Sequence, residues 1–320
     1  MLSFLKLIRI QNLLIIAFTQ YVVRWCLVFP LVRLKSSYYH LQLSELQFFL
    51  LVLSTVMIAA AGYAINDYFD VRIDKVNKPE RLVIDKGVKR RVAMGAHTVI
   101  NILAVLIGLY VSYSIGSWKL AIIHFICASG LWFYSTTFKR QFLIGNVIIA
   151  AFTALVPLIV AVYELLPIYR AYLPIEENLS FRPVWEYVIA LSFFAFITTL
   201  LREMLKDIED VEGDREFGCK TMPIVIGIKA TKNVAIVIAL ATMACLGYLQ
   251  WMMLKIDDKA SFIYFTIALQ LPFLFLVYRI IKAQTKKEFR FAGNLSKFIM
   301  LMGICYLFVF AYQLFPFIHD

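Results

Sequence analysis

The chain has 320 residues, enough for one large soluble domain or two small ones, but 62% of its residues are hydrophobic. Soluble domains are close to half apolar, so this composition excludes an ordinary soluble protein and indicates a membrane protein. A formal net charge of +11 would suit nucleic-acid binding, but most Lys and Arg residues lie in loops between apolar runs, which follows the positive-inside rule and argues against a nucleic-acid partner.

Apolar runs of about 20 residues recur along the chain, and each is long enough to cross a hydrocarbon core of roughly 30 Å as a helix. The fold class is therefore predicted to be all-α, a polytopic membrane bundle of about nine transmembrane helices in a single domain covering 1–320. The predicted spans are 8–32, 46–69, 92–113, 118–137, 142–163, 184–206, 230–254, 260–281 and 294–316.

The distribution of basic residues predicts the orientation of the bundle. The N-terminus and the segments 70–92, 202–232 and 279–297 are rich in Lys and Arg, which places them in the cytoplasm and the C-terminus outside. We expect an integral protein of the cytoplasmic membrane without a cleaved signal peptide, because the first apolar run is too long for one. The segment 164–183 contains proline and mixed charges and is expected to be a solvated outer loop.

Cysteine and histidine residues do not indicate a zinc site. The five cysteines include no C-x-x-C pair, and the four histidines are equally scattered along the chain. Four of the cysteines fall in apolar spans, where a small buried side chain is the simpler interpretation.

Acidic residues follow the second span abruptly, in the stretch NDYFDVRID from Asn66 to Asp74. If the preceding helix continues through this stretch, Asn66, Asp70 and Asp74 are one turn apart and share a face. Asp67 then points elsewhere.

A second acidic stretch, KDIEDVEGDREFGCK, follows the sixth span. Asp207, Asp210 and Asp214 recur at helical spacing, with Glu203 one turn earlier on the same face, although Gly213 weakens the last turn. The two stretches occupy similar positions in the two halves of the chain, which indicates a pseudo-repeat. Such duplication is found in transporters as well as in enzymes.

Clustered carboxylates near a bilayer repel one another and need a positive partner. Mg²⁺ suits oxygen ligands and is commonly held by one or two carboxylates together with the phosphates of a substrate. Two acidic clusters facing each other would hold two or more Mg²⁺ ions that bridge and neutralise a diphosphate. Basic residues beside the acids are candidates for the phosphate oxygens, namely Arg72, Lys139, Arg202 and Lys206.

Polar residues inside apolar spans are expected to face the bundle interior, because an unpaired amide in lipid is costly. Asn12 and Asn146 are of this kind. Aromatic residues such as Tyr134 are candidates for lining an apolar tunnel, although packing alone also accounts for them.

With these motifs, the sequence resembles the UbiA superfamily of intramembrane prenyltransferases over nearly its whole length. The resemblance rests on both aspartate motifs and on shorter matches at Arg9 and Asn12, at Tyr134, Ser135 and Lys139, and at Gly145 and Asn146. It implies a helical bundle around a central cavity, in which cytoplasmic motif loops bind Mg²⁺ and a prenyl diphosphate.

The family resemblance assigns roles to particular residues. The expected metal ligands are Asn66, Asp70, Asp74, Asp207, Asp210 and Asp214. The expected catalytic residues are Asp70, Asp74, Asp210, Asp214 and Lys206. The expected substrate-binding residues are Arg9, Asn12, Arg72, Tyr134, Lys139, Asn146 and Arg202.

Within the family, the second motif most resembles the archaeal-type digeranylgeranylglyceryl phosphate synthases. These enzymes attach a geranylgeranyl chain to the hydroxyl of the membrane lipid precursor geranylgeranylglyceryl phosphate. The segment Pro79 to Arg91 departs from the Arg-Pro-Ile-Pro-Ser-Gly run usual in that group. Basic residues in this region are candidates for binding an acceptor phosphate, namely Lys86, Lys89, Arg90 and Arg91.

Two alternatives stay open from the sequence. One keeps the enzyme but changes the acceptor to an aromatic quinone precursor, such as 4-hydroxybenzoate or a dihydroxynaphthoate. The other is a cation-coupled transporter, which would place acids near the middle of its spans rather than at their ends.

Overall fold

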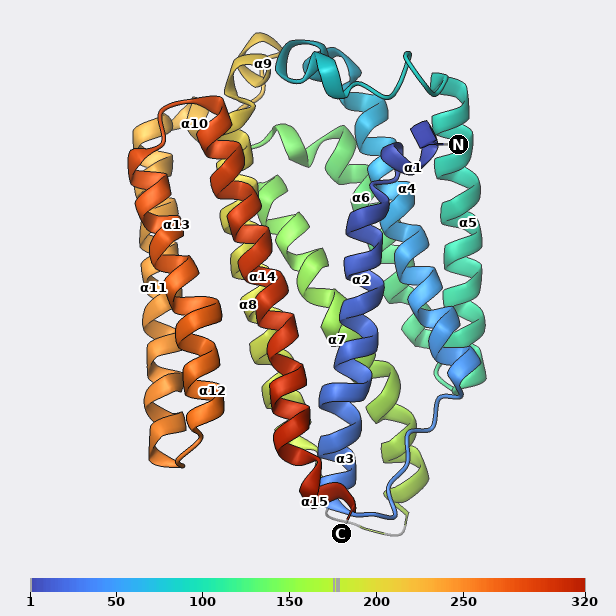
Figure 1. Ribbon diagram of the computed structural model, residues 1–320. Coiled ribbons are helices and arrows are strands. Elements are labelled where there is room, and N and C mark those ends of the chain that lie inside the picture. The colour runs from blue at the N-terminus through green and yellow to red at the C-terminus, as the bar shows by residue number, and fades with distance from the viewer. Residues whose placement is uncertain (1, 175, 177–178, 320) are drawn as a thin grey trace.

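The computed structural model describes residues 2–174, 176 and 179–319, and within that part the chain is helical, with one isolated bridge between Ile84 and Val88. The helices run side by side in a bundle (Figure 1). The N-terminus, α9 and the connection between α4 and α5 lie at one end, and the C-terminus lies at the other. The end that holds α9 is called the motif end below.

The long helices are α2 (Ile10–Val23), α4 (Glu45–Asn77), α5 (Arg90–Ser114), α6 (Ala121–Thr136), α7 (Ile144–Tyr172), α8 (Arg182–Glu209), α11 (Ile228–Lys255), α13 (Leu271–Lys282) and α14 (Lys286–Leu314). The short helices are α1 (Leu2–Leu7), α3 (Phe29–Lys35), α9 (Val211–Glu216), α10 (Met222–Val225), α12 (Lys259–Tyr264) and α15 (Pro316–His319). Two π-helical segments, Arg24–Val28 and Phe265–Gln270, join α2 to α3 and α12 to α13.

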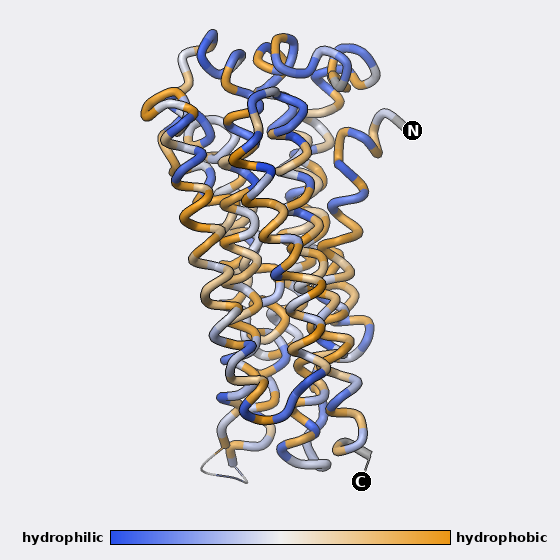
Figure 2. Tube along the Cα trace, turned by 60° about the vertical axis from the view of Figure 1, so that its left-hand side comes forward, coloured by the Kyte–Doolittle hydropathy of each residue, from blue (hydrophilic) through white to orange (hydrophobic). Residues whose placement is uncertain are grey.

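Eight helical segments of the described chain are long and apolar enough to cross a membrane. The one predicted span that is not among these eight, 118–137, corresponds to α6, whose 16 residues give a length of about 24 Å. Hydrophilic residues gather at the two ends of the bundle, and its middle is mainly hydrophobic (Figure 2). The predicted all-α membrane fold of about nine helices is therefore confirmed.

Helix α4 continues through the first acidic motif and ends at Asn77, as the helical spacing of Asn66, Asp70 and Asp74 requires. It begins at a capping box in which Ser44 and Gln47 satisfy each other's backbone N–H groups. Gly62 lets α6 approach α4 closely just before the motif, because a Cβ atom there would lie 2.7 Å from Leu131 Cδ1. The motif is thus the end of a packed membrane helix.

One expectation from the sequence is wrong. Helix α7 extends to Tyr172, so the first part of the segment 164–183 is helical and not a solvated loop. Glu164 is fully buried and forms an ion pair with Arg24, 2.8 Å between Oε1 and Nε. Because Arg24 neutralises Glu164, the acid does not end the apolar helix.

Candidate active site

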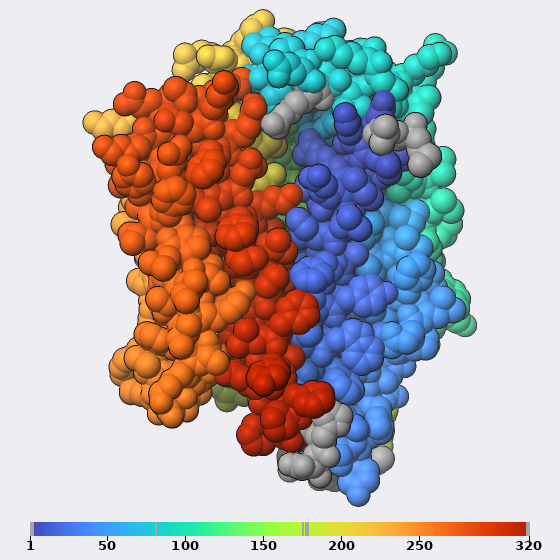
Figure 3. All heavy atoms as spheres, in the orientation of Figure 1, coloured from blue at the N-terminus to red at the C-terminus, as the bar shows by residue number. Residues whose placement is uncertain are grey.

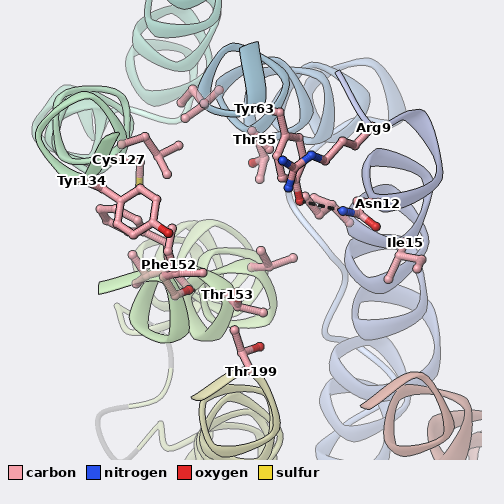
Figure 4. Close-up of a pocket in the computed structure, with 18 of the residues that line it drawn as sticks. Arg9, Asn12, Ile15, Thr55, Tyr63, Cys127, Tyr134, Phe152, Thr153 and Thr199 are labelled. Atoms are coloured by element: carbon pink, nitrogen blue, oxygen red, sulfur yellow. Dashed lines mark hydrogen bonds between the residues drawn. The ribbon is translucent and has the colours of Figure 1, made fainter. Parts of the chain in front are cut away.

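A cavity of about 210 Å³ lies among α2, α4, α6, α7, α8 and α14. Its wall is mostly apolar and aromatic, with polar residues concentrated toward one end. Arg9, Tyr63 and Asn12 gather on one side of the cavity, and Tyr134 and Phe152 lie on the opposite side (Figure 4). A cavity with this lining can hold an apolar chain and bind a charged group at one end.

A smaller polar chamber adjoins this cavity. Five aspartates line it, two from α4 and three from the end of α8 and from α9. They are Asp70, Asp74, Asp207, Asp210 and Asp214. Tyr134 and Lys206 line both the chamber and the apolar cavity, so these two residues mark the boundary between them. Acids from the two halves of the sequence therefore face the same space.

Basic and amide groups hold these acids. Asp70 accepts hydrogen bonds from Lys139 and from Asn66 Nδ2, the latter at 2.8 Å. Asn146 Nδ2 donates to Asp207 at 2.8 Å, and Lys78 pairs with Asp210, also at 2.8 Å. Each of these contacts compensates a carboxylate placed where water is scarce.

The ionisation of the chamber follows from this arrangement. Burial opposes the charge on Lys139, but the Asp70 carboxylate, together with Tyr134 and Asp74, outweighs burial and raises the pKa of this ammonium group above its ordinary value. Burial raises the pKa of Asp214 to about 6, and the neighbouring Asp210 carboxylate adds to that rise. The chamber therefore holds carboxylates in excess, and an added cation would stabilise their charged forms.

The donor set of the chamber fits magnesium. In the described part of the chain, no three His, Cys, Asp or Glu side chains converge on one point at metal-ligand distance. Mg²⁺ does not require three, since one or two carboxylates suffice when substrate phosphates complete the shell. Two oxygens of the predicted ligands, Asn66 Oδ1 and Asp210 Oδ1, are buried without a hydrogen-bond partner and are free to take such an ion.

The two motif segments are joined directly by Asn77, the last residue of α4. Its Nδ2 donates to the backbone oxygen of Asp210, and its Oδ1 accepts from the backbone N–H of Gly213, both at 2.9 Å. A Cβ atom on Gly213 would lie 2.7 Å from the Asn77 side chain. Asn77 thus fixes the position of one acidic motif relative to the other.

Cations cluster at the polar end of the larger cavity. Arg9 adopts a left-handed backbone conformation, φ 53°, between α1 and α2. Its guanidinium pairs with Asp67 at 2.8 Å and lies over the Tyr63 ring. Arg202 and Lys206 both pair with Glu203, at 2.7 and 3.4 Å. Asp67 therefore pairs with Arg9, in agreement with its predicted orientation away from the other acids.

The predicted site residues fall into three groups. Most of them line the cavity or the chamber, namely Arg9, Asn12, Asn66, Asp70, Asp74, Tyr134, Lys139, Arg202, Lys206, Asp207, Asp210 and Asp214. Asn146 lies behind Asp207 and holds it. Arg72 was expected to bind substrate, but it is exposed on α4 and lines neither space, because it projects from a different face of the helix than Asp70.

Four residues at the site had no role assigned to them from the sequence, although Glu203 was expected on the acidic face of the second motif and Lys78 was among the basic residues noted beside the first. Asn77 and Lys78 follow the first motif, and Glu203 has the spacing of the second motif. Their positions beside the motifs could therefore have identified them as site residues. Lys297 lines the larger cavity from α14; in the sequence it was counted with the basic segment 279–297, which overlaps the predicted span 294–316. A single lysine within an otherwise apolar helical pattern was the only sign of this position.

The basic residues proposed from the sequence for an acceptor phosphate lie elsewhere. Lys86, Lys89, Arg90 and Arg91 are all exposed. Lys86 donates to the backbone oxygen of Pro79, and Arg90 pairs with Asp85. None of the four lines the cavity or the chamber.

Residues 36–302 match the UbiA prenyltransferase family. A digeranylgeranylglyceryl phosphate synthase of Methanobrevibacter smithii is 34% identical over 195 residues, which cover 60% of this chain and 62% of that relative. The enzyme of the same name from Thermococcus kodakarensis is 32% identical over 228 residues, covering 67% and 73%. The chain thus spans less than two thirds of the length of the Methanobrevibacter smithii enzyme.

Solved structures show the same fold. A digeranylgeranylglyceryl phosphate synthase has a TM-score of 0.63 at 22% identity, with 97% of this chain and 98% of that chain covered. A UbiA homologue from Archaeoglobus fulgidus bound to DMAPP and Mg²⁺ has a TM-score of 0.53 at 15% identity, covering 96% and 99%. The family resemblance seen in the sequence is confirmed.

Proposed function

Because the chain belongs to the UbiA prenyltransferase family, we propose that it transfers a prenyl group from a prenyl diphosphate to a membrane lipid acceptor. One observation carries this proposal: a chamber lined by five aspartates adjoins a mostly apolar cavity. A prenyl diphosphate has the same two parts, an anionic head and an apolar tail, so it fits across the boundary at Tyr134 and Lys206. The transporter alternative is not retained, since the family is one of enzymes.

Magnesium is the proposed cofactor. Asn66, Asp70, Asp74, Asp207, Asp210 and Asp214 would hold it, and a structural neighbour was solved with Mg²⁺ and DMAPP. When bound, Mg²⁺ supplies positive charge that stabilises diphosphate as a leaving group. Lys139 and Lys206, which line the chamber, add cations beside the same phosphate oxygens.

The proposed reaction proceeds at the boundary between the two spaces. The allylic C–O bond breaks, and its electron pair leaves with the diphosphate. The apolar wall of the cavity keeps water from the allylic cation. The acceptor hydroxyl oxygen then forms the new C–O bond, and its proton passes to a carboxylate or diphosphate oxygen of the chamber. Tyr134 lies where the allylic carbon would react, and its ring face can stabilise positive charge.

Geranylgeranyl diphosphate and geranylgeranylglyceryl phosphate are the proposed donor and acceptor. The support is the shared name of the relatives, which are digeranylgeranylglyceryl phosphate synthases. An aromatic acceptor receives no such support. We further propose that the bundle acts as one domain and that the motif end faces the cytoplasm, because the basic loops lie there.

Purified protein tests this function. It is incubated with Mg²⁺, geranylgeranyl diphosphate and a panel of acceptors, and the products are identified by mass spectrometry. We expect digeranylgeranylglyceryl phosphate, and we expect EDTA to abolish its formation. Diphosphate release that persists in EDTA would overturn the metal mechanism. Turnover of 4-hydroxybenzoate with none of the glyceryl phosphate would overturn the acceptor.

A further inference from the structure

Lys297 occupies an unusual position on α14. We propose that Lys297, with Asn12, Arg9 and Arg202, forms a second anion site that binds the phosphate of the acceptor, separate from the aspartate chamber. The proposal rests on the function proposed above and names the residues that select a phosphorylated acceptor.

Lys297 has no carboxylate partner among the residues that the structure describes. Its only hydrogen bond there is to Asn12 Oδ1, at 2.5 Å. The other cations that line the larger cavity are each paired with an acid: Arg9 with Asp67, and both Arg202 and Lys206 with Glu203. Lys297 is therefore the cation of this cavity whose charge is left for a ligand.

The surroundings of Lys297 make an unpaired charge costly. It is half-buried, and it lies eleven positions beyond Lys286, the first residue of α14, which is about 16 Å along the helix. Its ammonium group is repelled by the guanidinium groups of Arg202 and Arg9. An ionised residue at membrane depth is generally placed there for a partner or a substrate. Because Arg9 and Arg202 are already paired with acids, the charge of Lys297 is the one that an anionic ligand would neutralise.

Asn12 gives this group of residues a defined geometry. Its Nδ2 donates to the Tyr63 hydroxyl at 3.2 Å, and the Arg9 guanidinium lies over the Tyr63 ring, 4.8 Å from its centroid. Figure 4 shows these three residues together on one side of the cavity. The Asn12 oxygen is thereby turned toward Lys297, so the ammonium group is held in place before a ligand binds.

The site is distinct from the place of the donor diphosphate. Lys297, Arg9, Asn12 and Arg202 line the larger cavity and not the aspartate chamber. They come from α2, α8 and α14, and a hollow opens between the upper parts of α2 and α14 on the face shown in Figure 3. With the diphosphate in the chamber, the anion on this side belongs to the second substrate.

The charge of the site favours a phosphate over a carboxylate. Arg9, Arg202 and Lys297 face Asp67 and Glu203, which leaves one positive charge in excess. Lys206, at the boundary with the chamber, also pairs with Glu203 and brings the excess at this end of the cavity to two. A phosphate monoester carries about −1.5 to −2 charges near neutral pH, whereas a carboxylate carries one. A lipid with a phosphate monoester beside its reacting hydroxyl therefore matches the site.

Equilibrium binding without Mg²⁺ or donor tests the proposal independently of turnover. The titrants are geranylgeranylglyceryl phosphate and the same prenylated glycerol without phosphate, measured by calorimetry in detergent. For Lys297→Met we expect affinity for the phosphorylated lipid to fall about 10- to 100-fold, the loss of a charge-assisted hydrogen bond. Affinity for the alcohol should stay the same. Lys297→Arg should retain most of the preference for phosphate.

Lys287→Met is the matched control, since Lys287 is exposed on the same helix, and it should bind both lipids as the wild type does. If Lys297→Met does not fold, Asn12→Leu tests the same site and should reduce the same preference. An equal loss for both lipids, or no preference for phosphate in the wild type, would overturn the proposal. Tight, Lys297-dependent binding without any turnover would count against the proposed function alone.

Discussion

The side chain of Asn77 accepts a hydrogen bond from the backbone N–H of Gly213 at 2.9 Å, which fastens the end of α4 to α9. The same side chain donates to the backbone oxygen of Asp210. The acids of the two motifs are separated by more than 130 residues, and these bonds set their spacing. The geometry of the chamber therefore depends on a residue that is itself not expected to contact metal or substrate.

Asn77→Ala should loosen the chamber. It removes two hydrogen bonds, worth about 1 kcal/mol each, so we expect a lower melting temperature and a higher Mg²⁺ concentration for half-maximal activity. Gly213→Ala should act in the same direction, because its Cβ would lie 2.7 Å from Asn77. Asn294→Ala, at an exposed position on α14, is the control. An unchanged Mg²⁺ requirement in Asn77→Ala would show that the bridge does not set the chamber.

Asp70→Ala and Asp210→Ala should each reduce turnover by about 100-fold or more, since both remove charge placed at the reacting diphosphate. Both proteins should still fold. Removal of Asp70 also leaves Lys139 without its partner, so that variant should show weaker Mg²⁺ dependence and a changed donor KM. Steady-state kinetics over a range of Mg²⁺ and donor concentrations measures both effects. Near-normal activity in either variant would remove that aspartate from the metal site.

The chamber should bind Mg²⁺ less tightly in acid. Burial raises the pKa of Asp214 to about 6, and a protonated carboxyl does not ligate the ion. Above that pKa the ligand is ionised, so affinity is full, and below it affinity should fall by up to about tenfold per pH unit. The rise in melting temperature caused by Mg²⁺ measures this between about pH 5 and about pH 7.5.

Asp214→Asn serves as the comparison for the pH experiment. Because its side chain does not titrate, the Mg²⁺-induced rise in melting temperature should be smaller than in the wild type and should depend less on pH. An equally steep dependence in Asp214→Asn would assign the effect to another group.

The acidic face of α4 was predictable because its residues repeat at the period of a helix. This spacing can be seen within one short stretch of sequence, and so can the similar spacing of the acids that end at Asp214. The bonds from Asn77 to α9 and from Lys297 to Asn12 join segments that are distant in sequence, so no periodicity reveals them. Arg72 shows the opposite error, because proximity in sequence to Asp70 did not place its side chain on the same face.

The extended helix α7 has a similar origin. Glu164 and the nearby prolines read as a loop, since the sequence does not show that Arg24 on a different helix neutralises the acid. The charge of Glu164, taken without its partner, therefore led us to end the predicted span at 163, whereas the helix continues to Tyr172. The same ion pair now predicts where the bundle is vulnerable.

Glu164→Ala should strongly destabilise the protein without changing its Mg²⁺ requirement. Arg24 is 1% exposed and Glu164 is fully buried. Loss of the acid leaves a buried guanidinium whose remaining polar partners, among the residues that the structure describes, are Glu45 and the Leu43 carbonyl oxygen. Removing one member of a buried pair generally costs about 3–5 kcal/mol. Thermal unfolding in detergent should show a clear drop in melting temperature.

A double variant and an exposed pair make this last prediction specific. Arg24→Met combined with Glu164→Leu should be more stable than Glu164→Ala, because no buried charge is left alone. Glu186→Ala breaks the exposed pair with Arg182 at the start of α8 and should change stability little, as is usual for surface pairs. If Glu164→Ala unfolds at the same temperature as Glu186→Ala, the buried pair does not hold the π-helical segment Arg24–Val28 against α7.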